Sequence, residues 1–179
     1  MALKVSPKRE LIEERLTMFV DGRSFGGSFS ASRRVSHAPD GGNRLHGHTY
    51  EIAVSLKGKA GAGQRFTFPF EQLIAIVKGL CAELNNKVIL ASGGANVYKE
   101  DSRSIEYMSA DNKRYVLPLD DVKLLPVEEV TIEALSSWVG EQIAGRLGEY
   151  HDYYANIAEI KITLFEGRQR GCTVAVQLT

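Results

Sequence analysis

A strict alternation of apolar and polar residues that begins at Tyr50 constrains the fold of this chain more than any other feature. The apolar positions are Tyr50, Ile52, Val54 and Leu56, and the polar positions are Glu51, Ser55 and Lys57. Successive side chains of a β-strand point to opposite faces, so the pattern predicts a strand that is buried on one face only. The chain must therefore place other elements over the apolar face of a sheet.

Two later segments have the spacing of helices that could cover this face. In residues 70–84 apolar positions recur every three or four residues, and Thr131 is a suitable N-cap for a second helix with a similar stripe. The two stripes consist of Phe70, Leu73, Ile74, Val77, Leu80, Cys81 and Leu84, and of Ile132, Leu135, Val139 and Ile143. We expect the first helix to end near Asn85 and Asn86.

Further strands are predicted on both sides of these helices, and a short helix is expected at residues 6–16. The strand-like segments are LTMFVDG (16–22), RFTFPF (65–70), SIEYMS (104–109), RYVLPL (114–119), EIKITLFE (159–166) and CTVAVQL (172–178). The turns ADNK and GRQRG join the last four segments into two hairpins. This order of elements predicts an α+β domain with its helices on one face of the sheet.

Composition and charge limit the classes of partner. The 179 residues are most simply one domain, 1–179, and 22 Lys and Arg balance 22 Asp and Glu. This balance argues against binding to nucleic acids or membrane surfaces, which usually requires a basic excess. No apolar run reaches the length of a membrane span, and Cys81 and Cys172 form neither a metal-type pair nor a disulfide framework. We therefore expect a soluble protein of the cytoplasm.

The sequence His46-Gly47-His48 is the part of the chain most suggestive of chemistry. At the start of the predicted strand, the two imidazoles point to the same face and can bind one ion. A catalytic zinc normally takes three protein ligands and keeps one open position. Two such histidines can equally be structural and donate to backbone carbonyls, so the pair alone leaves zinc binding open.

Several segments resemble, in order, the landmarks of the 6-pyruvoyl-tetrahydropterin and 6-carboxy-tetrahydropterin synthases. They are FSAS (29–32), RLHGHTY (44–50), TIEALSSWV (131–139) and FEGRQRGC (165–172). The resemblance implies a T-fold, which is an antiparallel four-stranded sheet with two helices on one face. The segment at about 96–125 resembles a β-hairpin inserted in one branch of the family. The resemblance also implies homo-oligomers, often hexamers, with active sites at subunit interfaces.

In that family, zinc held by three histidines coordinates the side-chain hydroxyls of a dihydropterin triphosphate. His46 and His48 match the second and third ligands, but Arg33 stands at the position of the first. Arginine cannot replace a histidine ligand, because the guanidinium stays protonated and has no lone pair to donate. His37 lies close in sequence, although relatives with three ligands often carry a histidine there too. The metal site that the resemblance implies is therefore incomplete.

The positions of the family's proton-transfer groups are replaced as well. Gly42 stands where the catalytic cysteine is expected, and Asn85 and Asn86 stand at the positions of its Asp-His pair. An amide can orient a hydroxyl but does not shuttle a proton near neutral pH. Catalytic residues can therefore not be assigned from the sequence.

Groups that could bind a ligand are retained. Glu166 matches the glutamate that anchors the pterin ring, and its two oxygens can accept parallel hydrogen bonds from the ring N–H and the 2-amino group. Thr131 and Glu133 match weaker landmarks at the start of the second helix. Arg33 could pair with a carboxylate or phosphate of the ligand, or with a neighbouring subunit. Arg34 is expected on the opposite face, in solvent.

These observations favour a protein that binds a small molecule with a pterin-like or purine-like ring and has lost the family's standard lyase activity. The alternative is an active zinc-dependent lyase of pterin or deazapurine biosynthesis, which would act on dihydroneopterin triphosphate with rearranged catalytic groups. The two hypotheses differ in whether a proton-transfer group remains in the site.

Overall fold

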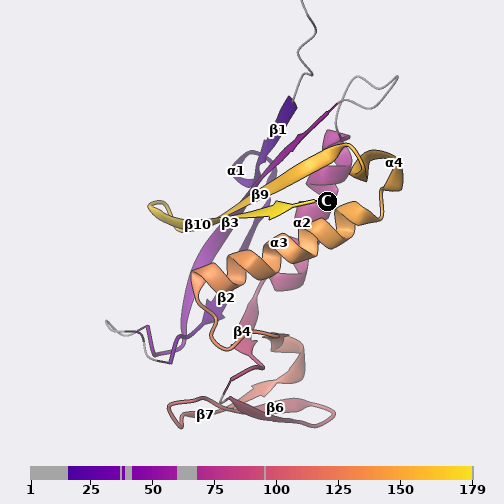
Figure 1. Ribbon diagram of the computed structural model, residues 1–179. Coiled ribbons are helices and arrows are strands. Elements are labelled where there is room, and N and C mark those ends of the chain that lie inside the picture. The colour runs from indigo at the N-terminus through magenta and orange to yellow at the C-terminus, as the bar shows by residue number, and fades with distance from the viewer. Residues whose placement is uncertain (1–15, 37, 39–41, 60–67, 95, 179) are drawn as a thin grey trace, which may run out of the picture.

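The computed structural model describes residues 16–36, 38, 42–59, 68–94 and 96–178. These residues form a mixed seven-stranded sheet with two long helices against one face, and a separate three-stranded antiparallel sheet at one end (Figure 1). The strands are β1 (Leu16–Asp21), β2 (Ser28–Arg33), β3 (His46–Gly58), β4 (Lys87–Ala91), β5 (Val97–Glu100), β6 (Ser104–Met108), β7 (Arg114–Pro118), β8 (Val122–Leu125), β9 (Ile157–Glu166) and β10 (Arg170–Gln177). The helices are α1 (Gly22–Phe25), α2 (Phe70–Leu84), α3 (Ile132–Gly148) and α4 (His151–Tyr154), with a 3₁₀ turn at Leu119–Asp121.

The expected four-stranded antiparallel sheet is present as the neighbours β10, β9, β3 and β2, but the sheet is larger than predicted. Strand β1 adds antiparallel to the far half of β3, and β4 and β8 add in parallel beside β2. The chain leaves α2 through Asn86, whose φ of 60° redirects it onto the edge of β2. Because β4 then runs in the direction of β2, the prediction of a purely antiparallel sheet is wrong.

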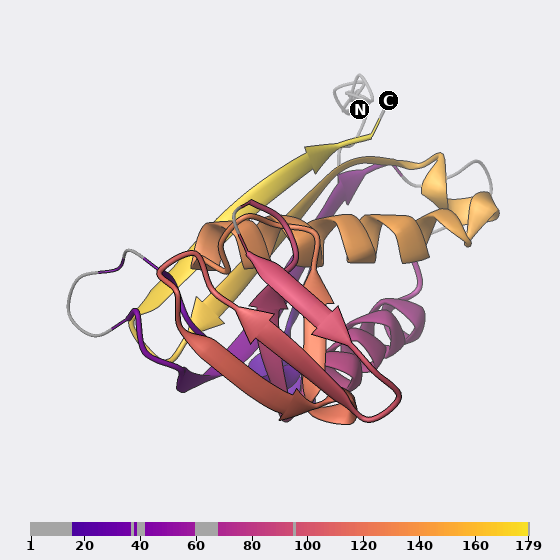
Figure 2. The ribbon, with the colours of Figure 1, turned by 90° about the horizontal axis from the view of Figure 1, so that it is seen from below.

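The expected inserted hairpin is also larger than predicted. Strands β6 and β7 pair as expected, with Tyr107 opposite Tyr115, but β5 adds a third strand to this sheet. Parallel neighbours such as β4 and β8 need a crossover connection of a dozen or more residues. The inserted sheet supplies that connection and lies beneath the end of the main sheet (Figure 2).

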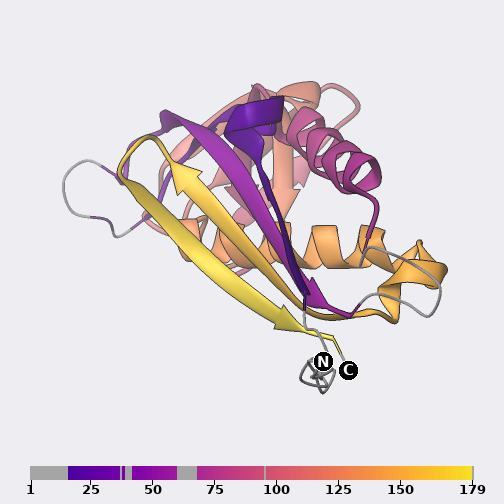
Figure 3. The same ribbon diagram turned by 90° about the horizontal axis from the view of Figure 1, so that it is seen from above.

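The core lies between the sheet and the helices, which share one side of it (Figure 3). The predicted apolar face of β3 is confirmed, because Tyr50, Ile52, Val54 and Leu56 are fully buried. Helix α2 contacts β1 and β2, whereas α3 packs on β9 and β10. Each stretch of the buried face is therefore covered by one helix.

Most of the predicted helical stripes are buried, with one clear error. Phe70 is 53% exposed, whereas Phe68 and Ile76 are buried instead. Phe70 is the first residue of α2, and the residues from Phe68 to Phe70 form a bend and a helix start rather than the predicted strand. The remainder of that predicted strand and the helix predicted before residue 16 fall outside the described residues.

Helix α3 begins as predicted. The Thr131 hydroxyl accepts a hydrogen bond from the Ala134 amide at 3.2 Å, which is the expected N-cap contact. Leu135, Val139 and Ile143 are fully buried. None of the described helices is both long and apolar enough to span a membrane.

Truncation of one core side chain on β9 tests this arrangement. Ile162 is fully buried between the sheet and α3, so Ile162→Ala is expected to lower the free energy of unfolding by about 2–5 kcal/mol. Lys161→Ala, at the adjacent exposed position, is the matched control and should change it by less than about 0.5 kcal/mol. Urea titration followed by circular dichroism measures both. Equal effects of the two substitutions would contradict the assignment of faces.

Candidate functional site

The candidate site lies on the core face of the sheet, at the end where the helices stop covering it. The antiparallel register places Arg33 opposite His46, and Tyr50 opposite Glu166. His48 lies between His46 and Tyr50 on the same face of β3. The structure therefore brings Arg33, His46, His48 and Glu166 together, four of the residues that the sequence singled out.

A buried ion pair between Arg33 and Glu166 is the centre of this cluster. The Arg33 Nη2 donates to Glu166 Oε1 at 2.6 Å, and its Nε donates to the same oxygen at 3.2 Å. The side chains are only 9% and 5% exposed, so the pair is shielded from water. Arg33 thus binds the carboxylate that the sequence assigned to a ligand ring.

Two groups that sequence reasoning missed complete the surroundings of Arg33. The Tyr50 hydroxyl accepts from Arg33 Nε at 2.8 Å, and the Val130 carbonyl accepts from Nη1 at 2.7 Å. Burial raises the pKa of Tyr50 to about 12, so its hydroxyl stays neutral. Tyr50 stands two residues after His48 in the strand pattern, and this spacing is the signal that could have placed it in the site.

The two oxygens of Glu166 have different surroundings. Oε1 also lies 3.2 Å from His48 Nε2 and 3.4 Å from the Tyr50 hydroxyl. Oε2 lies 3.6 Å from Arg170, whose side chain is 73% exposed. Burial raises the pKa of Glu166, but the hydrogen bond and charge of Arg33 lower it more, so the net pKa lies below the usual value. Glu166 is therefore an ionised carboxylate whose Oε1 takes most of the described contacts, while the nearest described partner of Oε2 is Arg170.

The described residues do not fit a zinc ion at His46 and His48. His46 Nδ1 is hydrogen-bonded to the Arg44 carbonyl at 2.7 Å, which leaves its Nε2 for a metal, whereas His48 Nε2 lies 3.2 Å from Glu166 Oε1. Burial lowers the pKa of His48, and the charges of Arg33 and His46 add to this effect while Glu166 opposes it. In the described part of the chain, no group of three or more His, Cys, Asp or Glu side chains is arranged to hold a metal. His37, the other candidate ligand, falls outside the described residues.

Thr131 and Glu133 differ in their position relative to the ion pair and in their exposure to solvent. Thr131 follows Val130, the residue whose carbonyl binds Arg33, so it stands beside the cluster. Glu133 is exposed on the first turn of α3. Arg34 is a clear error of the sequence analysis, since it is only 3% exposed and not solvated.

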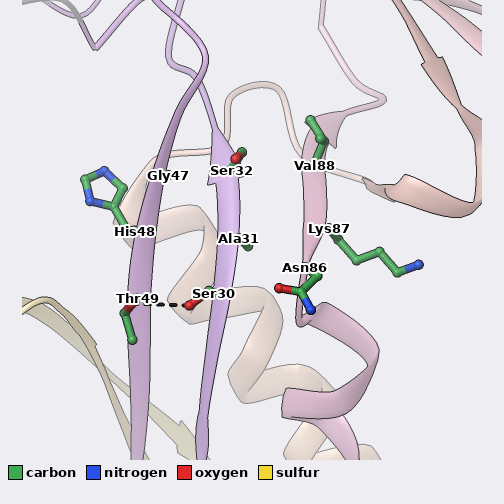
Figure 4. A pocket seen from close by; sticks show the side chains of 9 residues that line it. All are labelled: Ser30, Ala31, Ser32, Gly47, His48, Thr49, Asn86, Lys87 and Val88. Carbon is green, nitrogen blue, oxygen red and sulfur yellow. Dashed lines mark hydrogen bonds between the residues drawn. The ribbon is translucent and has the colours of Figure 1, made fainter.

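A cavity of about 400 Å³ lies along β2, β3 and the start of β4. Its lining consists of Ser30, Ala31, Ser32, Gly47, His48, Thr49, Asn86, Lys87 and Val88. Figure 4 shows the Ser30 and Thr49 hydroxyls joined across the two strands, where they lie 3.2 Å apart. These hydroxyls alternate along the strands with Arg33 and Tyr50 and so belong to the opposite face of the sheet. His48 lines the cavity, but its ring lies on the face of the ion-pair cluster and points away from the other side chains drawn in Figure 4.

Comparisons with known proteins identify the family of this chain. A family profile described as 6-pyruvoyl tetrahydropterin synthase matches residues 24–176. The chain belongs to this family. A Methanocaldococcus jannaschii protein named "Putative 6-carboxy-5,6,7,8-tetrahydropterin synthase" is 34% identical over 152 residues, which cover 85% of this chain and 91% of that relative. A Pyrococcus horikoshii protein with the same name is 29% identical over 123 residues, or 69% of each chain.

Solved structures of the 6-pyruvoyl tetrahydropterin synthase family share the fold. The Plasmodium falciparum 6-pyruvoyl tetrahydropterin synthase superimposes with a TM-score of 0.79 at 21% identity, over 92% of this chain and 99% of that chain. The crystal structure of the Plasmodium vivax 6-pyruvoyl tetrahydropterin synthase gives a TM-score of 0.78 at 18% identity, with the same coverage. At this identity, the likeness establishes the fold alone. The hexamer expected from the family stays a prediction.

Three positions that the resemblance assigns to family catalytic groups have structural contacts here. The Asn85 side-chain oxygen accepts from the Ser30 amide at 2.9 Å, and the Asn86 amide donates to the Ser30 carbonyl at 2.7 Å. The Gly42 carbonyl accepts from the Val35 amide at 3.0 Å. Asn85 and Asn86 therefore attach the end of α2 to the edge of β2.

The Arg33–Glu166 pair should produce a specific dependence of stability on pH. Arg33 holds the folded pKa of Glu166 below its unfolded value of about 4.3. The pair therefore stabilises the folded chain above that pH, and the stabilisation is lost as the pH falls through the folded pKa. Glu166→Gln should cost about 3 kcal/mol or more at pH 7, because Arg33 is left buried without its counter-charge.

Urea denaturation of both proteins between pH 7 and pH 2 measures this difference. The gap between wild type and Glu166→Gln should narrow as the pH falls below the unfolded pKa and through the lowered folded pKa of Glu166, where the wild-type carboxyl becomes protonated. Glu159→Gln, on the same strand but at its other end, is the matched control and should show a small gap at all pH values. A gap for Glu166→Gln that stays constant with pH would show that the carboxylate charge is not what stabilises the site.

Proposed function

We propose that this protein binds a pterin-like ring at Glu166 and Arg33 without the zinc-dependent lyase chemistry of its family. The observation that carries the proposal is the position of Arg33, which occupies the place expected for the first zinc ligand and binds the ring-anchoring carboxylate. With a guanidinium in place of a histidine, the binding site carries an additional positive charge and additional hydrogen-bond donors.

Arg33 opposes the binding of a divalent cation for two reasons. Its guanidinium has no lone pair for a metal, and its fixed positive charge lies opposite His46 and close to His48, the two histidines that a metal would contact. One of the two histidine donors is also engaged, since His48 Nε2 lies 3.2 Å from Glu166 Oε1. The site therefore resembles a closed hydrogen-bonded network more than an open metal centre.

The same network leaves one acceptor and two donors that could bind a ring with an N–H group next to a carbonyl. Glu166 Oε2 has one described neighbour, the exposed Arg170, and can accept from a ring N–H. Arg33 uses three of the five N–H groups of a guanidinium in the contacts to Tyr50, Glu166 and Val130, which leaves two to donate to a carbonyl. Pterins and guanine-like purines present this donor beside an acceptor.

Proton transfer lacks the groups that the family reaction would use. The expected cysteine and Asp-His positions hold Gly42, Asn85 and Asn86, and the two asparagines form structural contacts. Amides do not exchange protons near neutral pH. The curated relatives named for 6-carboxytetrahydropterin synthesis favour the alternative, a lyase acting on dihydroneopterin triphosphate, in which a metal-free His46 or His48 would have to serve as the base.

Ring binding is tested with pterin as the probe. Titration calorimetry or quenching of pterin fluorescence should detect binding to the wild type, and Glu166→Gln should weaken it at least about tenfold, because a hydrogen bond to a charged group contributes roughly 1.5–3 kcal/mol. Glu159→Gln should bind like the wild type. Absence of wild-type binding at millimolar pterin would refute the proposal.

A gain-of-metal variant tests the role assigned to Arg33. Elemental analysis after zinc loading and dialysis should find the wild type almost free of zinc, whereas Arg33→His should retain close to one zinc per chain, because a third imidazole then joins His46 and His48. The triple variant with His46→Ala and His48→Ala is the control and should lose the metal again.

Stoichiometric zinc in the wild type would instead favour the lyase alternative. Consumption of dihydroneopterin triphosphate by the wild type, lost in Glu166→Gln, would establish that alternative and end the proposal of binding without turnover.

A further inference from the structure

The three-stranded inserted sheet reaches the candidate site through Arg34. This residue directly follows Arg33, and its guanidinium is buried against the turn between β6 and β7. Arg34 Nη2 donates to both oxygens of Asp111, at 2.8 Å and 2.7 Å. It also lies 5.9 Å from the centre of the Tyr115 ring in a cation–π contact. Both partners belong to the insertion.

The Asp111 carboxylate is built into its own turn. The Ser109 hydroxyl donates to Asp111 Oδ1 at 2.6 Å, and Lys113 lies 3.4 Å from Oδ2. The hydrogen bond from Ser109 lowers the pKa of Asp111 to about 2, with further lowering by Arg34. The carboxylate is therefore ionised throughout the physiological pH range. Contacts within its own turn hold it in place in addition to its contacts with Arg34.

Both described ends of the connection between β2 and β3 are fixed by these groups. The Asn43 carbonyl accepts from Arg34 Nε at 3.2 Å, from Arg34 Nη2 at 3.0 Å and from Lys113 Nζ at 3.0 Å. At the other end, the Ser36 amide donates to Glu129 Oε2 at 2.9 Å, and its hydroxyl lies 3.3 Å from Arg34 Nη1. One buried guanidinium thus joins the departing strand, the returning strand and the insertion.

The position of Arg34 determines how Arg33 enters the site. Adjacent side chains of an extended chain point to opposite sides, so anchoring the Arg34 guanidinium on one side directs Arg33 into the core face. Asn43 precedes His46 by three residues, and His46 is the register partner of Arg33. Displacement of either end of the connection would therefore move both Arg33 and His46.

We propose that the inserted sheet is a clamp that positions the ligand site, with Asp111 as its positioning residue. Asp111 acts through Arg34 and Asn43 and makes no described contact with the Arg33–Glu166 pair itself. This role does not depend on which ring the site binds. It gives a function to the inserted sheet, which a minimal four-stranded T-fold lacks.

Asp111→Asn tests the clamp, because it keeps the shape of the side chain and removes the charge that binds Arg34. The ¹⁵N chemical shifts of the His46 and His48 imidazoles should change in this variant, since both rings report on the position of Arg33 and Glu166. The shifts of His151, on α4 beyond the far end of α3, should stay at their wild-type values. Nuclear magnetic resonance of the ligand-free protein measures all three.

Glu106→Gln is the matched control within the same inserted sheet. It removes a carboxylate that pairs with Arg114 in solvent, where the side chains are 41% and 60% exposed, and should leave His46 and His48 unchanged. Wild-type shifts of both histidines in folded Asp111→Asn would overturn the proposal, as would equal changes in the control.

A milder variant keeps the test decisive if Asp111→Asn does not fold. Lys113→Ala removes one of three donors to the Asn43 carbonyl from a side chain that is 41% exposed. It should change the ¹⁵N chemical shifts of the His46 imidazole, and unchanged His46 shifts would overturn the proposal. If pterin does not bind but the variants change the histidine shifts as expected, the proposed function is refuted and the positioning role of the inserted sheet stands.

Discussion

The buried ion pair between Arg33 and Glu166 is the interaction on which the rest of the site depends. Two charges with side chains less than one-tenth exposed are stable only when their remaining hydrogen-bonding groups are satisfied. Tyr50 and the Val130 carbonyl meet that requirement for Arg33, and His48 and Tyr50 do so for Glu166. The pair therefore fixes the end of β2, the start of β3, the end of β9 and the entry to α3 at one point.

The pair also changes what a site on this fold can bind. A carboxylate with two free oxygens offers a ring two acceptors, whereas Glu166 has given one oxygen to Arg33, His48 and Tyr50. The guanidinium adds donors of its own in exchange. In the proposed binding mode, the ligand must present a donor and an acceptor side by side, and Arg33 supplies the positive charge of the site.

The fold supports this pair from two sides with different kinds of structure. On the core side, apolar residues of β3 and β9 pack under α2 and α3 and hold the register that makes Tyr50 and Glu166 neighbours. On the other side, polar contacts of Arg34 with the inserted sheet hold the connection between β2 and β3. The first support is apolar and needs few specific groups, while the second depends on a small number of well-placed charges.

The sequence by itself determined the family, the order of most elements and the residues that could meet in the site. The alternation in β3, the helical stripes, the Thr131 cap and the two hairpins follow from short-range periodicity and turn chemistry, which are written locally in the chain. The shared face of His46 and His48 followed from strand periodicity, and Arg33 and Glu166 were singled out by their family positions. The error at Phe70 arose where a helix start and a preceding strand give similar local patterns.

Only the tertiary structure decided which charges meet. Arg33 and Glu166 are far apart in sequence, and no local pattern states that their partner lies within the same chain rather than in a ligand or a neighbouring subunit. The same holds for Arg34, which looks solvent-exposed in the sequence because its partner Asp111 comes from a distant insertion. The parallel strands β4 and β8 were also missed, since strand direction depends on where α2 and the inserted sheet return the chain. Which distant residues pair is set by the packing and burial of the whole chain. Local periodicity describes only neighbouring residues and therefore cannot predict such pairs.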